Sequence, residues 1–238
     1  DDVVKVFDSE PGSVVIPNPN LEAEYAYNVD LNVAKMFGKS VKVDVSTYYT
    51  LLDNALVRRD FTLNGASEIV YDGELSQVQA IQNAAKANVY GIQAGVEVKL
   101  PTGFRFSTDL NFQKGEEELD NGDKSPSRHA APFFGISRVG YANSKVDLEL
   151  NFQFSDKVAF KDLAEEEKGK PEIYAIDSNG NPYSPSWYTL NLKSMYKLTE
   201  NFTLTAGLEN ITDQRYRPYS SGIVAPGKNF ILALRAKF

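Results

Sequence analysis

The stretch 146–154 reads VDLELNFQF, and it decides the fold because every second residue in it is apolar. Val146, Leu148 and Leu150 alternate with Asp147 and Glu149, and the pattern continues to residue 154. Successive side chains of a β-strand point to opposite faces, so this alternation predicts a strand with one apolar and one polar face. A soluble sheet with one wet face alternates in the same way, so the stretch alone does not distinguish water from membrane.

Similar alternation recurs along the whole chain and predicts an all-β protein. Eight further strands are expected at 24–37, 41–49, 90–100, 104–112, 133–141, 188–196, 202–208 and 230–238, the fifth of the nine being the weakest in pattern.

The connections between these strands separate a membrane barrel from a soluble sandwich. Short turns are expected at 38–40, 101–103, 142–145 and 197–201, and long polar loops at 58–88, 114–132, 155–186 and 211–228. Strict alternation of short and long connections places tight turns at one end of the sheet and large loops at the other. Outer-membrane barrels have this plan, with short periplasmic turns and long extracellular loops, whereas Greek-key sandwiches do not produce it so regularly.

Aromatic residues give a second indication of a membrane barrel. Phe104 and Phe112 lie eight residues apart on one strand face, as do Tyr188 and Tyr196, and so does the pair that ends the chain. Eight residues span roughly 26 Å along a strand, which is close to the apolar band of about 25 Å between the two aromatic girdles of such barrels. The alternative is coincidence in an aromatic-rich chain.

The facing of individual residues follows from the alternation. Lipid-facing positions are expected at Leu148, Leu150, Leu190, Leu192, Leu204 and Leu232. Lumen-facing positions are expected at Asp109, Asn111, Glu149, Asn151 and Asn191.

Composition excludes several classes of function. The net charge of −7 argues against nucleic-acid binding, and the absence of cysteine removes thiolate nucleophiles and Cys-ligated zinc. The one histidine, His129, lies in a polar KSPSRH context, so no catalytic residue and no enzyme activity are predicted. No metal site and no cofactor are predicted either. The acidic runs at 116–118 and 165–167 could bind calcium, but solvated loop faces are the favoured interpretation.

The dipeptides 121–122 and 179–180, both Asn-Gly, predict turns at loop tips.

Short motifs near both ends of the chain resemble TonB-dependent outer-membrane receptors. The run 207–213, GLENITD, resembles the family's "NLxD" segment, and 225–230, APGKNF, is similar to the "PGRxF" entry to the last strand. Near the start, 18–24 reads NPNLEAE and resembles "NPxLxPE", with Ala23 where proline is usual. The chain ends on Phe238, as such barrels usually do, and HAAP at 129–132 resembles the Bacteroidetes branch.

The resemblance implies a plugged barrel of about 22 strands. Nine is an odd number of strands, and single-chain bacterial barrels have even numbers. Residues 1–238 are therefore expected to be one C-terminal segment of a larger barrel, with its C-terminus periplasmic and the N-terminal plug and TonB-contacting segment absent.

The resemblance also implies function and partners. The expected activity is TonB-coupled uptake of a scarce nutrient such as a siderophore, haem or cobalamin across the outer membrane of a Gram-negative bacterium. The alternatives are a passive porin, a surface adhesin, or a soluble carbohydrate-binding module. Expected partners are outer-membrane lipid and lipopolysaccharide, the TonB complex through the missing N-terminal region, and the barrel-assembly machinery, which would recognise Phe238. A surface lipoprotein partner is left open.

Loop residues supply the candidate ligand site at the extracellular mouth. Arginine can grip an anionic ligand and aromatic rings can stack on an aromatic one. His129 could ligate haem. The alternative for the set is ordinary loop packing and contact with lipopolysaccharide. The candidates are Arg58, Arg59, Arg128, His129, Trp187, Arg215, Tyr216, Arg217 and Tyr219.

Overall fold

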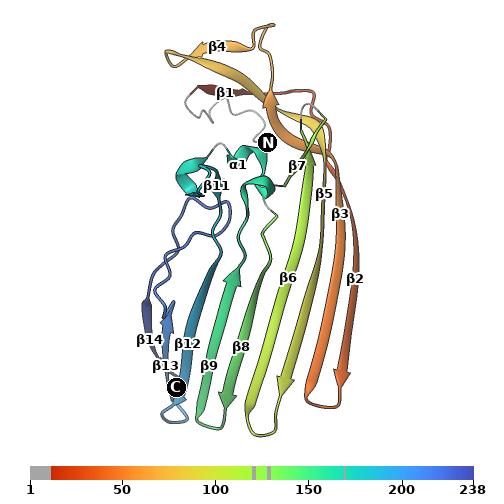
Figure 1. Cartoon of the computed structure of the whole chain (residues 1–238). Helices are drawn as coiled ribbons and strands as arrows, with labels where there is room; N and C mark the ends of the chain where they lie inside the picture. Colours follow the sequence, from red (N-terminus) through yellow and green to blue (C-terminus); the bar gives the residue numbers. More distant parts are fainter. Residues whose placement is uncertain (1–11, 120–121, 128–129, 169) are drawn as a thin grey trace. The chain divides into compact units, whose positions relative to one another are not determined.

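Nine strands follow one another across one sheet in chain order in the computed structural model (Figure 1). The structure describes residues 12–119, 122–127, 130–168 and 170–238. The nine strands are β2 (Tyr25–Phe37), β3 (Val41–Asp60), β5 (Glu74–Lys99), β6 (Phe104–Glu118), β8 (Phe134–Ala142), β9 (Val146–Ser155), β12 (Trp187–Lys197), β13 (Phe202–Glu209) and β14 (Asn229–Ala236). All nine expected strands are confirmed.

The sheet is an antiparallel meander that does not close. Antiparallel pairing joins β6 to β8, β8 to β9, β9 to β12, β12 to β13 and β13 to β14. β2 and β14 are the two ends of the strand order. The chain therefore forms part of a barrel, as expected.

Shorter elements lie between these strands. They are β1 (Ser13–Ile16), β4 (Glu68–Tyr71), β7 (Lys124–Pro126), η2 (Phe160–Asp162), α1 (Glu165–Lys168), η3 (Pro171–Ile173), β10 (Ala175–Ile176) and β11 (Pro182–Tyr183). No helix within the described residues is long and apolar enough to cross a membrane.

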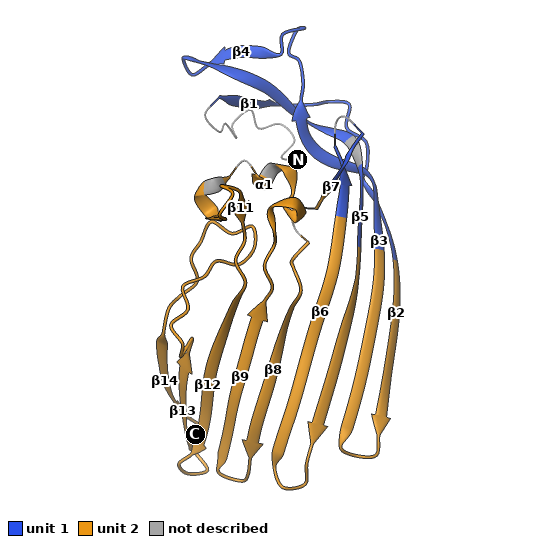
Figure 2. Cartoon of the chain, in the orientation of Figure 1, with its two compact units in different colours: residues 1–28, 50–89, 116–125 blue, residues 29–49, 90–115, 126–238 orange. Residues whose placement is uncertain are grey.

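The chain divides into two compact units, which Figure 2 colours separately. One comprises residues 1–28, 50–89 and 116–125, and the other comprises residues 29–49, 90–115 and 126–238. The strands β3, β5 and β6 each contribute residues to both units.

The larger unit confirms the short-turn plan. Each of the turns that follow β2, β5, β8 and β12 is four residues or fewer, and these turns lie at one end of the unit together with the C-terminus (Figure 1). Gly103 has φ of +92°, and a side chain there would meet the carbonyl oxygen of Ala142 at 2.2 Å, so the turn after β5 requires glycine. The connections after β9 and β13 lie at the opposite end of the same unit (Figure 1).

The two faces of the sheet have inverted burial. Leu150 and Leu192 are cross-strand partners and are 42% and 41% exposed. Asn151 and Asn191 are partners on the other face and are 4% and 8% exposed. A soluble sheet buries its leucines, whereas a barrel in lipid presents them outward and keeps its polar residues inside. The predicted grouping of apolar and polar residues on opposite faces is confirmed.

The smaller unit has a core of its own. β1 pairs in parallel with β5, bringing Val14 and Ile16 beside Val78 and Ala80. The half-buried side chains of Phe61, Ile69 and Tyr71 pack against this cluster.

Two of the predicted loops differ from the structure of this unit. The predicted loop 58–88 is wrong, because β3 continues to Asp60 and β5 already begins at Glu74, with β4 paired to it. The alanine- and glutamine-rich sequence at the start of β5 lacks a strong apolar alternation. This part of β5 is a strand because it pairs with β1 and β4. The predicted loop 114–132 is partly wrong for a similar reason, since β6 extends to Glu118 and β7 pairs with it.

Both predicted turns at loop tips contain a left-handed glycine. Gly180 has φ of +83° between β10 and β11, which confirms that turn. Asp177 anchors it by accepting hydrogen bonds from the backbone N–H groups of Asn179 and Asn181 at 2.8 and 2.9 Å, and these bonds lower the pKa of its carboxyl. Gly122 has φ of +83°, and Asn121 lies outside the described residues.

Candidate functional site

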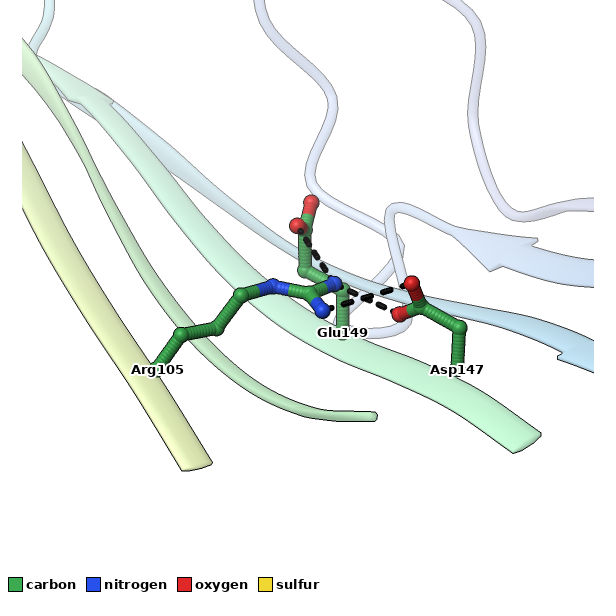
Figure 3. Close-up of polar contacts among 3 residues, drawn as sticks. All are labelled: Arg105, Asp147 and Glu149. Carbon is green, nitrogen blue, oxygen red and sulfur yellow. Dashed lines mark hydrogen bonds and ion pairs between the residues drawn. The ribbon is translucent and has the colours of Figure 1, made fainter. Parts of the chain in front are cut away.

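An ion-pair network lies on the polar face of the larger unit, at its short-turn side. Arg105 on β6 donates to Asp147 on β9 through both terminal nitrogens, at 2.6 and 3.3 Å. The same guanidinium approaches Glu149 at 3.5 Å, so one cation pairs with two carboxylates (Figure 3). Arg138 on β8 pairs with Asp109 at 2.6 Å. Three neighbouring strands are thereby cross-linked on the side predicted to face the lumen.

Replacing Arg105 by methionine should lower stability only modestly. The three side chains of its network are about a third exposed, so water screens the pair and we expect a cost of about 1 kcal/mol. Thermal unfolding in detergent measures it, with Lys193→Met as the control on the same face. A loss of several kcal/mol would show instead that the network is effectively dry in the assembled protein.

A cavity of about 670 Å³ opens on the same face, toward the loop end. Its apolar wall includes Phe134 and Ile136 of β8 and Trp187 at the start of β12. Tyr219, from the loop after β13, also lines it. Its polar wall includes Asn111, whose amide oxygen is buried and accepts no hydrogen bond from the residues that the structure describes. The volume is in the range that holds a drug-sized molecule.

Trp187 and Tyr216 form an aromatic stack at the edge of this cavity. Their ring centroids are 4.2 Å apart and their planes are inclined by 25°. Trp187 belongs to a strand and Tyr216 to the loop after β13, so the stack holds that loop against the sheet. Partial burial raises the pKa of the Tyr216 hydroxyl.

A smaller cavity of about 300 Å³ lies between two loops. Ile173, Tyr174 and Ala175 line one side, and Arg215, Tyr216 and Arg217 line the other. Arg217 donates from Nη1 to the carbonyl oxygen of Glu172 at 3.1 Å, which joins the two loops directly. Within the described part of the chain, the charged side chains of this lining are both arginines.

The loop between β9 and β12 is folded rather than loose. Leu163 and Ala164 are fully buried, and so is the carboxylate of Glu167. That carboxylate accepts hydrogen bonds from Lys170 at 3.2 Å and from the Tyr174 hydroxyl. An isolated bridge between Val158 and Ser184 closes the base of the loop.

The structure therefore brings together five of the predicted candidates, all in the larger unit. Trp187 and Tyr219 line the larger cavity, and Arg215, Tyr216 and Arg217 line the smaller one.

The other four candidates do not join this group. Arg58 and Arg59 lie on β3 within the smaller unit, where Arg59 donates to the carbonyl oxygen of Glu118 at 2.7 Å. Arg128 and His129 lie outside the described residues. Within those residues, no group of three or more His, Cys, Asp or Glu side chains could hold a metal ion.

Sequence reasoning missed the apolar wall of the larger cavity. Phe134 and Ile136 lie on the face that also carries Arg138, so the polar face of this strand is not uniformly polar. The signal was present in the weak alternation of 133–141, where apolar residues occupy both faces.

Comparison with known proteins identifies the family. The family model described as "TonB dependent receptor-like, beta-barrel" matches residues 5–211. The Hemoglobin-haptoglobin-binding protein A of Haemophilus influenzae is 24% identical over 263 residues, covering 96% of this chain and 24% of that protein. The Pesticin receptor of Yersinia pestis is 23% identical over 181 residues, covering 76% of this chain and 25% of that protein.

Solved structures share the fold. A ferric enterobactin receptor from Pseudomonas aeruginosa aligns with a TM-score of 0.69 and 17% identity, covering 95% of this chain and 33% of that one. The copper transporter OprC aligns with a TM-score of 0.67 and 14% identity, covering 92% and 32%. The chain thus spans a quarter to a third of the length of these relatives. The matched stretch covers most of the sequence, and the chain belongs to the TonB-dependent receptor β-barrel family.

Proposed function

We propose that this chain forms part of the barrel of an outer-membrane receptor that imports a scarce nutrient with energy supplied through TonB. TonB-dependent receptors are outer-membrane proteins of Gram-negative bacteria and act as receptors and transporters rather than enzymes. The observation that carries the proposal is the cavity at the loop end of the sheet, flanked by the Trp187–Tyr216 stack. A ligand bound there would lie on the wall of the lumen through which it must pass.

The candidate residues then have separate roles. Trp187, Tyr216 and Tyr219 offer aromatic surface to a flat or apolar group, and Arg215 and Arg217 offer charge to an anionic group. Arg58, Arg59, Arg128 and His129 remain candidates for contacts from other loops. The ligand itself would be a small molecule such as a siderophore, haem or cobalamin.

Partners follow from the proposed location. The exposed leucines of β9 and β12 would contact lipid, and the loops would contact lipopolysaccharide. The TonB complex and the barrel-assembly machinery would be further partners, and a surface lipoprotein stays an open alternative. The short-turn end, where the C-terminus lies, would face the periplasm.

Uptake measurements test the proposal. Cells that produce the intact receptor would be given ferric enterobactin, haemoglobin–haptoglobin and copper ions, a panel chosen from the names of similar proteins. We expect accumulation of one panel ligand in cells with TonB, and surface binding without accumulation in cells lacking TonB. Equal accumulation in both strains would indicate a passive pore and overturn the proposal.

Removing Phe238 should reduce assembly far more than stability. The residue is fully exposed in the structure, with an edge contact between its ring and that of Phe202 at 6.4 Å. Burial of a whole phenylalanine contributes about 1.5–3 kcal/mol, and an exposed ring contributes only a small part of that. We therefore expect an unchanged melting temperature for the protein that does assemble. We also expect a large drop in outer-membrane abundance, because the barrel-assembly machinery would no longer find the terminal aromatic residue that it is proposed to recognise.

Abundance by heat-modifiable mobility and melting in detergent provide the two readouts for the Phe238 deletion. Phe238→Tyr, which keeps a terminal aromatic ring, is the matched control and should assemble normally. Normal abundance with a markedly lower melting temperature in the deletion would assign Phe238 a structural role only.

A further inference from the structure

Three buried asparagines form a continuous hydrogen-bonded chain across the sheet at the base of the loop 211–228. Asn151 lies on β9, Asn191 on β12, and Asn210 directly follows β13. The Asn191 amide nitrogen donates to the Asn151 side-chain oxygen at 2.8 Å. The Asn210 backbone N–H donates to the Asn191 side-chain oxygen at 2.7 Å. These hydrogen bonds thus connect the polar face of the sheet to Asn210, the residue immediately before the loop.

The side chain of Asn210 closes the loop on itself. Its amide nitrogen donates to the carbonyl oxygens of Gln214 at 2.9 Å and Pro226 at 3.1 Å, and its amide oxygen accepts from the Gln214 N–H at 2.9 Å. One buried amide therefore ties together the outgoing and returning ends of the loop. Asp213 adds a second tie by accepting from the Lys228 N–H at 2.8 Å.

The backbone of Asn210 also explains why this residue type stands at the strand end. Its φ is +45°, in the left-handed region that asparagine tolerates better than most residues. Glycine adopts this conformation without strain but has no side chain to make the three loop-closing bonds. Substitution by glycine therefore separates the backbone role from the hydrogen-bonding role.

The loop that Asn210 closes carries Tyr216, which stacks on Trp187. Trp187 is four residues before Asn191 on the same strand, so one end of the stack is fixed by β12. The position of the other ring, Tyr216, depends on how the loop is held. A backbone hydrogen bond from Ala225 to Tyr216, at 2.9 Å, spans the loop but gives it no attachment to the sheet. Apart from the stack itself, the loop is attached to the sheet at its base, through Asn210 and through the Ile211 N–H, which donates to the carbonyl oxygen of Leu190 at 2.9 Å.

We propose that Asn210 is a positioning residue, whose side chain holds the loop 211–228 so that Tyr216 covers Trp187 at the edge of the large cavity. The importance of that stack for ligand capture rests on the proposed function, but the positioning does not. Loss of the Asn210 side chain removes the hydrogen bonds to Gln214 and Pro226, so the middle of the loop shifts and Tyr216 leaves the indole.

The test uses fluorescence of the intact receptor without any ligand. Trp187 is the one tryptophan of this chain, and the signal of any other in the intact receptor is subtracted with a Trp187→Phe version. Acrylamide quenching reports how far the indole is shielded. We expect Asn210→Gly to raise the quenching constant of Trp187 to the value of a Tyr216→Ala reference, with outer-membrane abundance and melting temperature unchanged.

Two further variants make the test specific. Asn210→Asp keeps the acceptor for the Gln214 N–H but loses both donated bonds, so its quenching constant should lie between those of the wild type and Asn210→Gly. Asn229→Ala removes an exposed asparagine near the far end of the loop and should quench like the wild type.

Wild-type quenching in Asn210→Gly would show that only the left-handed backbone matters and would overturn the proposal. If the glycine variant does not assemble, Asn210→Asp decides by the same measurement, and unchanged quenching in it overturns the proposal equally. Because no ligand is present, failure of the uptake experiment leaves this result unaffected.

Discussion

Deleting residues 156–186 should weaken ligand capture at least tenfold while leaving the barrel assembled. The deleted loop forms one wall of the small cavity through Ile173, Tyr174 and Ala175. It also supplies the Glu172 carbonyl that receives the hydrogen bond from Arg217. Loops carry recognition on a rigid scaffold, so we expect at least a tenfold loss of affinity, about 1.4 kcal/mol or more. Binding of the imported panel ligand to whole cells measures this loss.

The barrel should survive the deletion because the loop has its own small core. Leu163 and Ala164 are fully buried within it, and the Glu167 carboxylate is bonded to Lys170 and Tyr174 of the same loop. Without the loop, β9 and β12 can still pair from Ser155 and Trp187 at one end to Val146 and Tyr196 at the other. Heat-modifiable mobility of the outer-membrane fraction reports whether the folded barrel is retained.

The register of β9 and β12 shows where the two strands can be joined once the loop is deleted. Ser155 and Trp187 are directly paired across β9 and β12. An Asn-Gly dipeptide between them forms the two-residue turn that antiparallel strands accept most readily. Lys161→Ala combined with Asp162→Ala is the control, since both side chains are exposed in the same loop and line neither cavity. Undiminished capture by the deletion variant would place recognition outside this loop.

The sheet was predictable from the sequence because lipid and lumen impose opposite demands on alternate residues. The resulting alternation is clear in the sequences of β6, β9, β12 and β14, where nearly every second residue is apolar. The early start of β5 was not predictable, since it depends on pairing with β1 and β4 rather than on a pattern within the strand. Pairing between distant segments leaves only a weak signal in either one.

The candidate site was predictable only as a set of residue types. Tryptophan, tyrosine and arginine in polar loops indicated the chemistry, but sequence does not show that Tyr216 stacks on Trp187 or that Arg217 reaches Glu172. The motif containing Asn210 was noticed through resemblance alone. The physical role of Asn210, as a left-handed residue whose side chain bonds both ends of a loop, is visible only in the three-dimensional structure.

Replacing Leu192 by arginine should strongly destabilise the folded barrel in lipid. Leu192 lies midway along the apolar face of β12, between Tyr188 and Tyr196, with Leu150 beside it on β9. An arginine near the middle of the lipid-facing band costs about 2–4 kcal/mol, which is roughly a 30- to 1,000-fold shift against the folded state. The folded fraction in lipid vesicles as a function of urea, read by heat-modifiable mobility, gives this free energy directly.

Met195→Arg provides the matched control, because it places the same charge on the same strand but on the opposite face. Met195 is paired with Asp147 of β9 and with Thr205 of β13, and the lumen-side lysine Lys193 lies two residues before it. An arginine there meets water and a nearby carboxylate instead of acyl chains, so we expect a change of less than about 1 kcal/mol. The two positions are only three residues apart, so strand propensity and pairing are nearly constant between them. Equal destabilisation by both variants would mean that the apolar face of β12 does not face lipid, and a larger loss for Met195→Arg would mean that the sheet is inverted.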